Sequence, residues 1–210
     1  MPAPAVLAQK AYEAVRTGIL SGDLRPNQRL VEAEVCDLIG IGRTPVRGAL
    51  QMLENHGYLI KQRSSWTVRE FGPQDIKNVY ETRMALEGFA ARLTVERATD
   101  EEIARIAAIL ESHADLETLP PDEQVSLNSS FHDAIADASG NEHLARLIRR
   151  DRHFAFDYSA AKRYTADDYR HGHAGHHEIV AALQARDADA AERLVVEHYR
   201  LALEAQLRFL

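Results

Sequence analysis

The most restrictive stretch of the chain runs from Gly40 to Leu50 and contains Pro45. Proline has a fixed φ and no backbone N–H, so a helix tolerates it only in the first turn. A helix is therefore predicted to begin just before Pro45, and Gly40 and Gly42 allow a tight turn after the helical pattern Val31–Ile39. A short helix, a glycine turn and a second helix make up the helix-turn-helix, whose second helix enters the major groove of DNA.

The two faces of this second helix differ in chemistry. One face is predicted to be buried because its apolar residues recur at i, i+3, i+4 and i+7. These residues are Val46, Ala49, Leu50 and Leu53. Arg43 and Arg47 are four residues apart and lie with Thr44 on the opposite, solvent face. An ordinary helical pair with solvated arginines has the same pattern, so the flanking segments must distinguish the two interpretations.

The flanking segments indicate a winged helix. An amphipathic helix is predicted over Gln9–Ser21, and two short β-rich runs, Tyr58–Ile60 and Trp66–Val68, follow the second helix. The polar residues between these runs include Lys61 and Arg63. The runs therefore predict a hairpin with a basic tip, and we expect its two cations to contact DNA phosphates.

Residues 7–72 resemble the winged-helix domain of GntR-type bacterial transcription regulators. The matching residues are Ile19, Leu20, Ser21, Gly22, Asp23, Leu24, Pro26, Arg29, Leu30, Leu38, Ile39, Gly40, Arg43, Thr44, Pro45, Val46, Arg47, Ala49, Leu50, Leu53 and Gly57. The resemblance implies that Arg43, Thr44 and Arg47 contact the operator. Gly42 replaces the usual Ser or Thr helix cap, and Ala33 replaces an arginine that contacts DNA in many relatives. We therefore expect an altered or weakened set of DNA contacts.

Charge and length are consistent with a DNA-binding domain joined to a separate body. The net charge is −7 over 210 residues, which argues against unspecific coating of nucleic acid. Residues 1–72 carry nine basic against seven acidic side chains, whereas residues 73–210 carry 16 against 25. The single Cys36 excludes an internal disulfide. The chain shows no signal peptide and no apolar run of about 18 residues, so we expect a cytoplasmic protein without membrane contact, associated with the nucleoid when bound to its operator.

Gly and Pro in the segment Phe71–Pro73 indicate a domain boundary. Residues 1–72 are predicted to form a winged helix-turn-helix DNA-binding domain, and residues 73–210 an all-helical domain for effector binding and dimerisation. The predicted helices of the second domain are Gln74–Arg97, Ile103–Leu116, Pro120–Ala138, Asn141–Tyr158, Ala166–Ala185 and a last helix from Asp187 or Asp189 to Phe209. In the first of these helices, Ile76, Tyr80 and Phe89 are among the apolar residues at helical spacing. The predicted fold is mainly α, a winged helix with a small β-hairpin followed by a six-helix bundle.

Three of the ten histidines stand where helix geometry brings them together. His176 and His198 are 22 residues apart about a turn near residue 187, so each lies about 16 Å along its helix and the two are level. His132 is on a separate helix, with Asn128 one turn before it on the same face. Three imidazoles and one oxygen donor suit a first-row metal ion. Bundle histidines that only hydrogen-bond to their neighbours are the alternative.

Residues 73–210 resemble the FCD effector domain of the FadR-like branch of GntR regulators. The residues that carry the resemblance are Asp75, Ile76, Tyr80, Arg83, Leu86, Glu87, Phe131, His132, Gly140, Asn141, Leu144, His176, Ile179, Ala182, Leu183, Asp187, Ala191 and His198. The resemblance implies that Asn128, His132, His176 and His198 bind a divalent metal, with zinc favoured and nickel or manganese as alternatives.

An asparagine is a neutral ligand, so the bound ion would keep nearly its full charge. Such an ion favours an anionic further ligand, which we interpret as the carboxylate of a small organic acid. Arg83, predicted to face inward beside Tyr80, is a candidate to pair with a second carboxylate of this effector. A structural salt bridge between Arg83 and Glu87 is the alternative.

These features predict a ligand-responsive transcription regulator, which is not an enzyme. A homodimer would bind a palindromic operator through two copies of the recognition helix, and we expect repression that the effector releases. Two alternatives remain, a regulator that senses its ligand without metal and a three-histidine metalloenzyme. The enzyme lacks an evident general base and leaves the winged helix unexplained.

Overall fold

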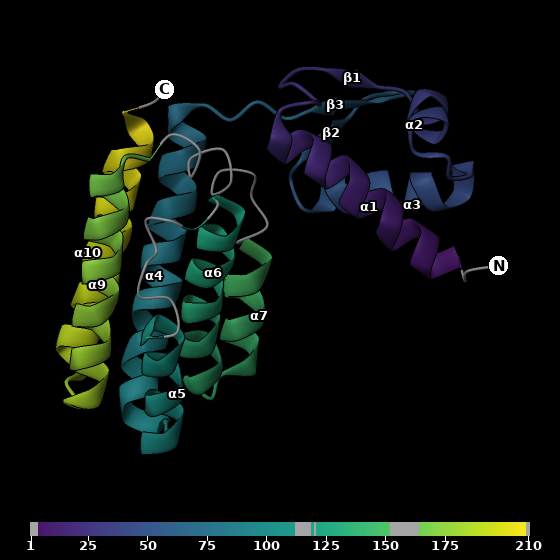
Figure 1. The fold of residues 1–210 in the computed structure, drawn as a ribbon. Helices are drawn as coiled ribbons and strands as arrows, with labels where there is room; N and C mark the ends of the chain where they lie inside the picture. Colours follow the sequence, from purple (N-terminus) through teal and green to yellow (C-terminus); the bar gives the residue numbers. More distant parts are fainter. Residues whose placement is uncertain (1–3, 112–118, 120, 152–163, 209–210) are drawn as a thin grey trace. The chain divides into compact units, whose positions relative to one another are not determined.

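A computed structural model of the protein describes residues 4–111, 119, 121–151 and 164–208. These residues divide into two compact units, the first ending at Phe71 and the second beginning at Gly72 (Figure 1). No helix within the described ranges is both long and apolar enough to cross a bilayer. Each unit has its own elements and its own core.

The first unit is a winged helix-turn-helix. Its elements are α1 (Pro4–Ser21), β1 (Arg29–Leu30), α2 (Glu32–Ile39), α3 (Arg43–Asn55), β2 (Leu59–Lys61) and β3 (Trp66–Val68). The strands form an antiparallel sheet in the order β1-β3-β2, with Leu30 opposite Trp66 and Ile60 opposite Thr67. The hairpin β2–β3 was predicted, whereas β1 was missed because two residues are too few to show the period of a strand.

The turn between α2 and α3 has the predicted geometry. Gly40 ends α2 in the left-handed region, with φ of 66°, and Gly42 precedes α3 without a side-chain cap. Pro45 lies in the first turn of α3. The four apolar residues predicted for the inner face of α3, Val46, Ala49, Leu50 and Leu53, are each 0% exposed. Their burial fixes which face of α3 is presented to solvent.

The second unit contains only helices among its described residues. They are α4 (Pro73–Arg97), α5 (Asp100–Glu111), α6 (Pro121–Ala138), α7 (Glu142–Asp151), α9 (Ala166–Gln184) and α10 (Ala188–Leu207). The long helix α4 contacts α6, α7, α9 and α10, and α9 lies against α10 (Figure 1). The predicted ends at Leu116, Tyr158 and Phe209 lie outside the described residues. The mainly α fold, a winged helix followed by a helical bundle, is confirmed.

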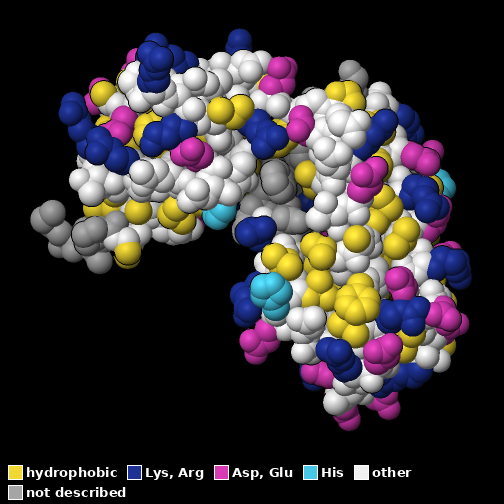
Figure 2. Space-filling view, turned by 180° about the vertical axis from the view of Figure 1, so that it is seen from behind, with side chains coloured by type: hydrophobic (Ala, Val, Ile, Leu, Met, Phe, Trp, Pro, Cys, Tyr) yellow, Lys and Arg dark blue, Asp and Glu magenta, His cyan; other side chains and the backbone are white. Residues whose placement is uncertain are grey.

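One apolar residue of the helical pattern in α4 lies outside the core. Ile76 and Tyr80 are each 2% exposed as expected, but Phe89 is 46% exposed. The inner face is occupied instead by small residues such as Gly88, where an added Cβ would lie 3.0 Å from Val196 of α10. The close approach of α4 and α10 therefore depends on small side chains. Figure 2 shows hydrophobic side chains gathered among charged ones on one face of this unit.

Candidate functional site

Three imidazoles from three helices meet inside the helical unit. They belong to His132 of α6, His176 of α9 and His198 of α10, and one ring nitrogen of each lies within 4.8 Å of the others. The Nε2 atoms of His176 and His198 are 3.2 Å apart. His132 and His176 are buried and His198 is partly buried. The structure thus brings together the three histidines that the sequence predicted to be neighbours.

The antiparallel pair α9–α10 places His176 and His198 at the same level. Arg186 has φ of 56° in the connecting turn, and Asp187 begins α10 by accepting a hydrogen bond from the backbone N–H of Ala190, at 2.9 Å. Gly175 lets the two helices approach beside the cluster, because a Cβ there would lie 3.2 Å from Nδ1 of His198. Glycine at position 175 therefore leaves room for the imidazole of His198.

A buried carboxylate orients the imidazole of His132. Nδ1 of His132 lies 3.0 Å from Oε2 of Glu87 on α4, and these side chains are 1% and 4% exposed. Because a carboxylate accepts, Nδ1 carries the proton, which in a neutral imidazole leaves the lone pair on Nε2. That Nε2 is buried and has no hydrogen-bond partner. A carboxylate behind a histidine is the arrangement that fixes the tautomer of metal ligands.

Burial keeps the imidazoles of His176 and His198 neutral. It lowers the pKa of His176 well below 6.5, and neighbouring histidines lower it further. Burial, together with the nearby His132, lowers the pKa of His198 to about 3. Neutral imidazoles have the lone pairs that a metal ion needs. At neutral pH both rings are therefore uncharged and competent as ligands.

The nitrogen set fits a first-row divalent ion. Zinc binds imidazole nitrogen at about 2.0–2.1 Å, so two ligands of a tetrahedral ion lie about 3.4 Å apart. The 3.2 Å between the Nε2 atoms of His176 and His198 is close to this value. The ring nitrogens of all three histidines lie within 4.8 Å of one another, so small side-chain shifts bring them to the ligand spacing of one ion. The Nε2 of His132, which is buried and has no hydrogen-bond partner, is placed where it could be the third ligand. Asn128 lies one turn before His132 on α6 and is half-buried, so its role as an oxygen ligand stays a prediction.

Aromatic contacts connect the two residues predicted to bind the effector, Arg83 and Tyr80, to the three histidines. Arg83 and Tyr80 are 5% and 2% exposed, and the guanidinium carbon of Arg83 lies 5.6 Å from the centre of the Tyr80 ring. The Tyr80 ring is 6.2 Å from that of Tyr199, which is 5.0 Å from the ring of His132. The rings of Tyr80 and Tyr199 therefore lie between the buried guanidinium of Arg83 and the imidazole of His132.

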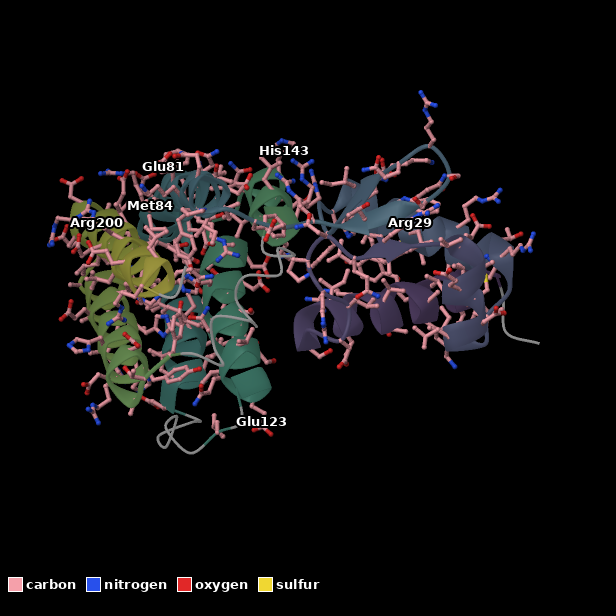
Figure 3. The ribbon with its side chains drawn as sticks, turned by 90° about the horizontal axis from the view of Figure 1, so that it is seen from above. Arg29, Glu81, Met84, Glu123, His143 and Arg200 are labelled. Atoms are coloured by element: carbon pink, nitrogen blue, oxygen red, sulfur yellow. The ribbon has the colours of Figure 1, made fainter. Side chains whose placement is uncertain are left out.

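Other histidines do not belong to this cluster. His143 is exposed at the start of α7 (Figure 3). His173 and His177 of α9 pair with each other, with 3.0 Å between their Nε2 atoms. Glu87, Gly175 and Tyr199 were not predicted as parts of the site. The sequence gives one clue to Glu87, which lies one turn after Arg83 on the same face of α4.

The predicted DNA-binding residues lie on the surface of the first unit. Arg43, Thr44 and Arg47 are exposed on α3, and Lys61 and Arg63 are exposed at β2 and the hairpin tip. Figure 2 shows basic side chains along part of this unit. The elements that carry these five residues are a recognition helix and a wing, which define a DNA-binding protein with a separate helical domain.

Comparison with known proteins identifies the family. Residues 7–68 match the bacterial regulatory proteins of the gntR family, and residues 78–201 match the FCD domain. The chain therefore belongs to the GntR family of transcriptional regulators and carries an FCD domain.

Relatives that match most of this chain are transcriptional regulators. The Nta operon transcriptional regulator of Aminobacter aminovorans is 29% identical over 180 residues, covering 85% of this chain and 84% of that protein. The HTH-type transcriptional repressor GlaR of Escherichia coli is 22% identical over 201 residues, covering 89% and 90%. The structure of E. coli McbR/YncC has the same fold, with a TM-score of 0.77, 22% identity and 99% of both chains covered. The protein is thus a transcriptional regulator rather than an enzyme.

Proposed function

We propose that this regulator senses a small carboxylate metabolite at a divalent metal ion in the FCD domain and changes its operator affinity in response. The observation that carries the proposal is the cluster of three imidazoles, in which the buried Nε2 of His132 has no hydrogen-bond partner and its Nδ1 is held by Glu87. Such an arrangement suits zinc, and nickel or manganese fit the same nitrogen donors.

The residues around the ion have separate roles in this proposal. His132, His176 and His198 bind the metal, and the amide oxygen of Asn128 is a fourth ligand. When bound, the ion supplies positive charge that attracts the carboxylate of the effector. Arg83, buried against the ring of Tyr80, pairs with a second carboxylate of the same molecule. A small dicarboxylate is therefore the effector class that the site favours.

DNA binding is proposed to need two copies of the chain. A homodimer presents two α3 helices to a palindromic operator, where Arg43, Thr44 and Arg47 read bases and Lys61 and Arg63 contact phosphates. Repression that the effector releases is the proposed mode, and the similarity to the repressor GlaR supports it.

The FCD domain is the proposed dimerisation domain, because two large apolar side chains, Phe89 on α4 and Leu201 on α10, are 46% and 48% exposed. Size-exclusion chromatography with light scattering measures the oligomeric state. A monomer at the concentration used for DNA binding contradicts dimerisation through the FCD domain.

Metal analysis of protein purified without a histidine tag tests the sensing site. We expect about one ion per chain, lost after dialysis against EDTA, and far less in the His132→Ala variant. A thermal-shift screen of small carboxylates then compares metal-loaded with metal-free protein, since a ligand raises the midpoint only by binding the folded state. Carboxylate binding that is equal with and without metal favours a metal-free sensor instead.

DNA binding is tested separately by selecting duplexes from a random library with the full-length protein. We expect an enriched palindrome, and weaker binding of that palindrome when the active carboxylate is added. Enrichment of no sequence contradicts the proposed operator recognition, whatever the metal content.

A further inference from the structure

Arg47 on the exposed face of α3 is held by a carboxylate from the preceding helix. Its Nε donates to Oε2 of Glu32 at 2.9 Å, and its Nη2 donates to Oε1 at 2.9 Å. The side chain of Arg47 is 61% exposed, whereas that of Glu32 is only 16% exposed. The pair therefore joins a partly buried anchor on α2 to an arginine that reaches into solvent.

The geometry of this pair leaves part of the guanidinium available. A guanidinium has five N–H donors in one plane, and Glu32 uses the side that carries Nε. The N–H groups at the far end, on Nη1 and the outer side of Nη2, lie along the direction of the side chain. Two parallel donors at this end match O6 and N7 of guanine in the major groove. Arg47 is thus able to keep Glu32 and bind a base at the same time.

Glu32 also lies among the cations predicted to bind DNA. Its hydrogen bonds to Arg47 lower its pKa, and the charges of Arg43 and Lys61 lower it further. The carboxylate therefore stays ionised and offsets one positive charge beside the recognition helix. Random DNA is bound mainly through phosphate charge, so this negative charge weakens unspecific binding.

We infer that Glu32 is a positioning residue for DNA specificity, which holds Arg47 so that its end reads a guanine of the operator and reduces attraction to other DNA. The inference rests on the proposed role of α3 in reading the operator. Glu32 itself touches no base in this arrangement. It acts by fixing the guanidinium plane of Arg47 before binding, so less conformational freedom is lost on the operator.

The test compares Glu32→Gln with a matched control in the full-length protein. Glu34→Gln removes one negative charge from the same first turn of α2, and Glu34 is exposed. The duplex enriched by the wild type and a scrambled duplex are titrated by fluorescence anisotropy at several salt concentrations. For Glu32→Gln we expect weaker binding of the operator and tighter binding of the scrambled duplex. The ratio of operator affinity to scrambled-duplex affinity therefore falls about tenfold. For Glu34→Gln the ratio should stay within about twofold, since charge alone acts on both duplexes.

A modified base separates base reading from phosphate contact. Each guanine of the enriched duplex is replaced in turn by 7-deazaguanine, which lacks the N7 acceptor. At one position per half-site we expect wild-type binding to weaken severalfold, and Glu32→Gln to be much less affected. Circular dichroism and melting midpoints confirm that both variants are folded.

Two results overturn the inference while operator recognition stands. If Glu32→Gln tightens binding to both duplexes equally, Glu32 only competes with DNA for Arg47. If the ratio and the response to 7-deazaguanine both equal those of the wild type, Glu32 does not position Arg47. A wild-type protein that enriches no sequence instead removes the proposed operator recognition, and the inference with it.

Discussion

The hydrogen bond between Glu87 and His132 predicts how metal affinity depends on a residue that touches no metal. Both side chains are almost fully buried, so water does not replace a lost partner. Loss of such a carboxylate typically weakens metal binding 10- to 100-fold, or about 1.4–2.7 kcal/mol. Glu87→Gln keeps an acceptor oxygen for Nδ1–H and loses the charge, so we expect about a tenfold effect. Glu87→Ala also leaves Nδ1–H buried and unpaired, so its effect should approach 100-fold.

Competition with a chromophoric chelator measures these zinc affinities on protein purified without a tag. Glu81→Gln is the matched control, because Glu81 is exposed on the same helix (Figure 3). Melting of the metal-free variants separates lost binding from lost folding. Zinc affinity of a folded Glu87→Ala variant within twofold of the wild type would refute the assigned role of Glu87 in orienting His132.

Three further changes test the fold and the site. Gly175→Ala should push His198 from the cluster and lower zinc affinity at least severalfold, without lowering the metal-free melting midpoint, because alanine favours the helix. The metal-free protein should lose stability as the pH falls from 6.5 towards 3, by up to about 1.4 kcal/mol per pH unit for each of His176 and His198. In that pH range the unfolded chain binds protons at these histidines and the folded chain does not. Urea titrations that give the same free energy of unfolding at each pH would contradict the burial of His176 and His198 in neutral form. Leu53→Ala should cost about 2–5 kcal/mol in urea unfolding of the first unit, and a loss below 1 kcal/mol contradicts the packed core of α3.

The winged helix was predictable because its signals are local. Pro45 and Gly40 define the ends of two helices by backbone geometry alone, and both act within a few residues. The apolar spacing from Val46 to Leu53 then defines the buried face. By contrast, β1 is a strand only because it pairs with β3, and Arg29 and Thr67 are far apart in the sequence. Its two residues contain no signal of their own.

Helix spacing also predicted which histidines meet, but not how they are arranged. Placing His176 and His198 at equal distance from a turn needs only the rise of a helix, so the sequence was sufficient. His132 was predicted to join them from a separate helix, and the FCD resemblance supported the three as metal ligands. Phe89 belongs to the apolar pattern of α4 but lies outside the core, because spacing defines a face of a helix without showing which neighbour covers it. Gly88 lies against α10, whereas the neighbouring Phe89 is exposed.

The residues that orient the proposed ligands share a feature that explains why the sequence did not reveal them. Glu32 holds Arg47 from α2, and Glu87 holds His132 from α4. Each carboxylate belongs to a different helix from the side chain it orients, so no spacing within one helix links them. A base-reading arginine and a metal-binding imidazole are both useful only in one orientation, and each has free rotation about its side-chain bonds until a partner fixes it. A buried or partly buried carboxylate supplies that partner in both units. The two substitutions Glu32→Gln and Glu87→Gln therefore test the same physical idea, that orientation rather than contact limits each site, in two assays that do not depend on each other.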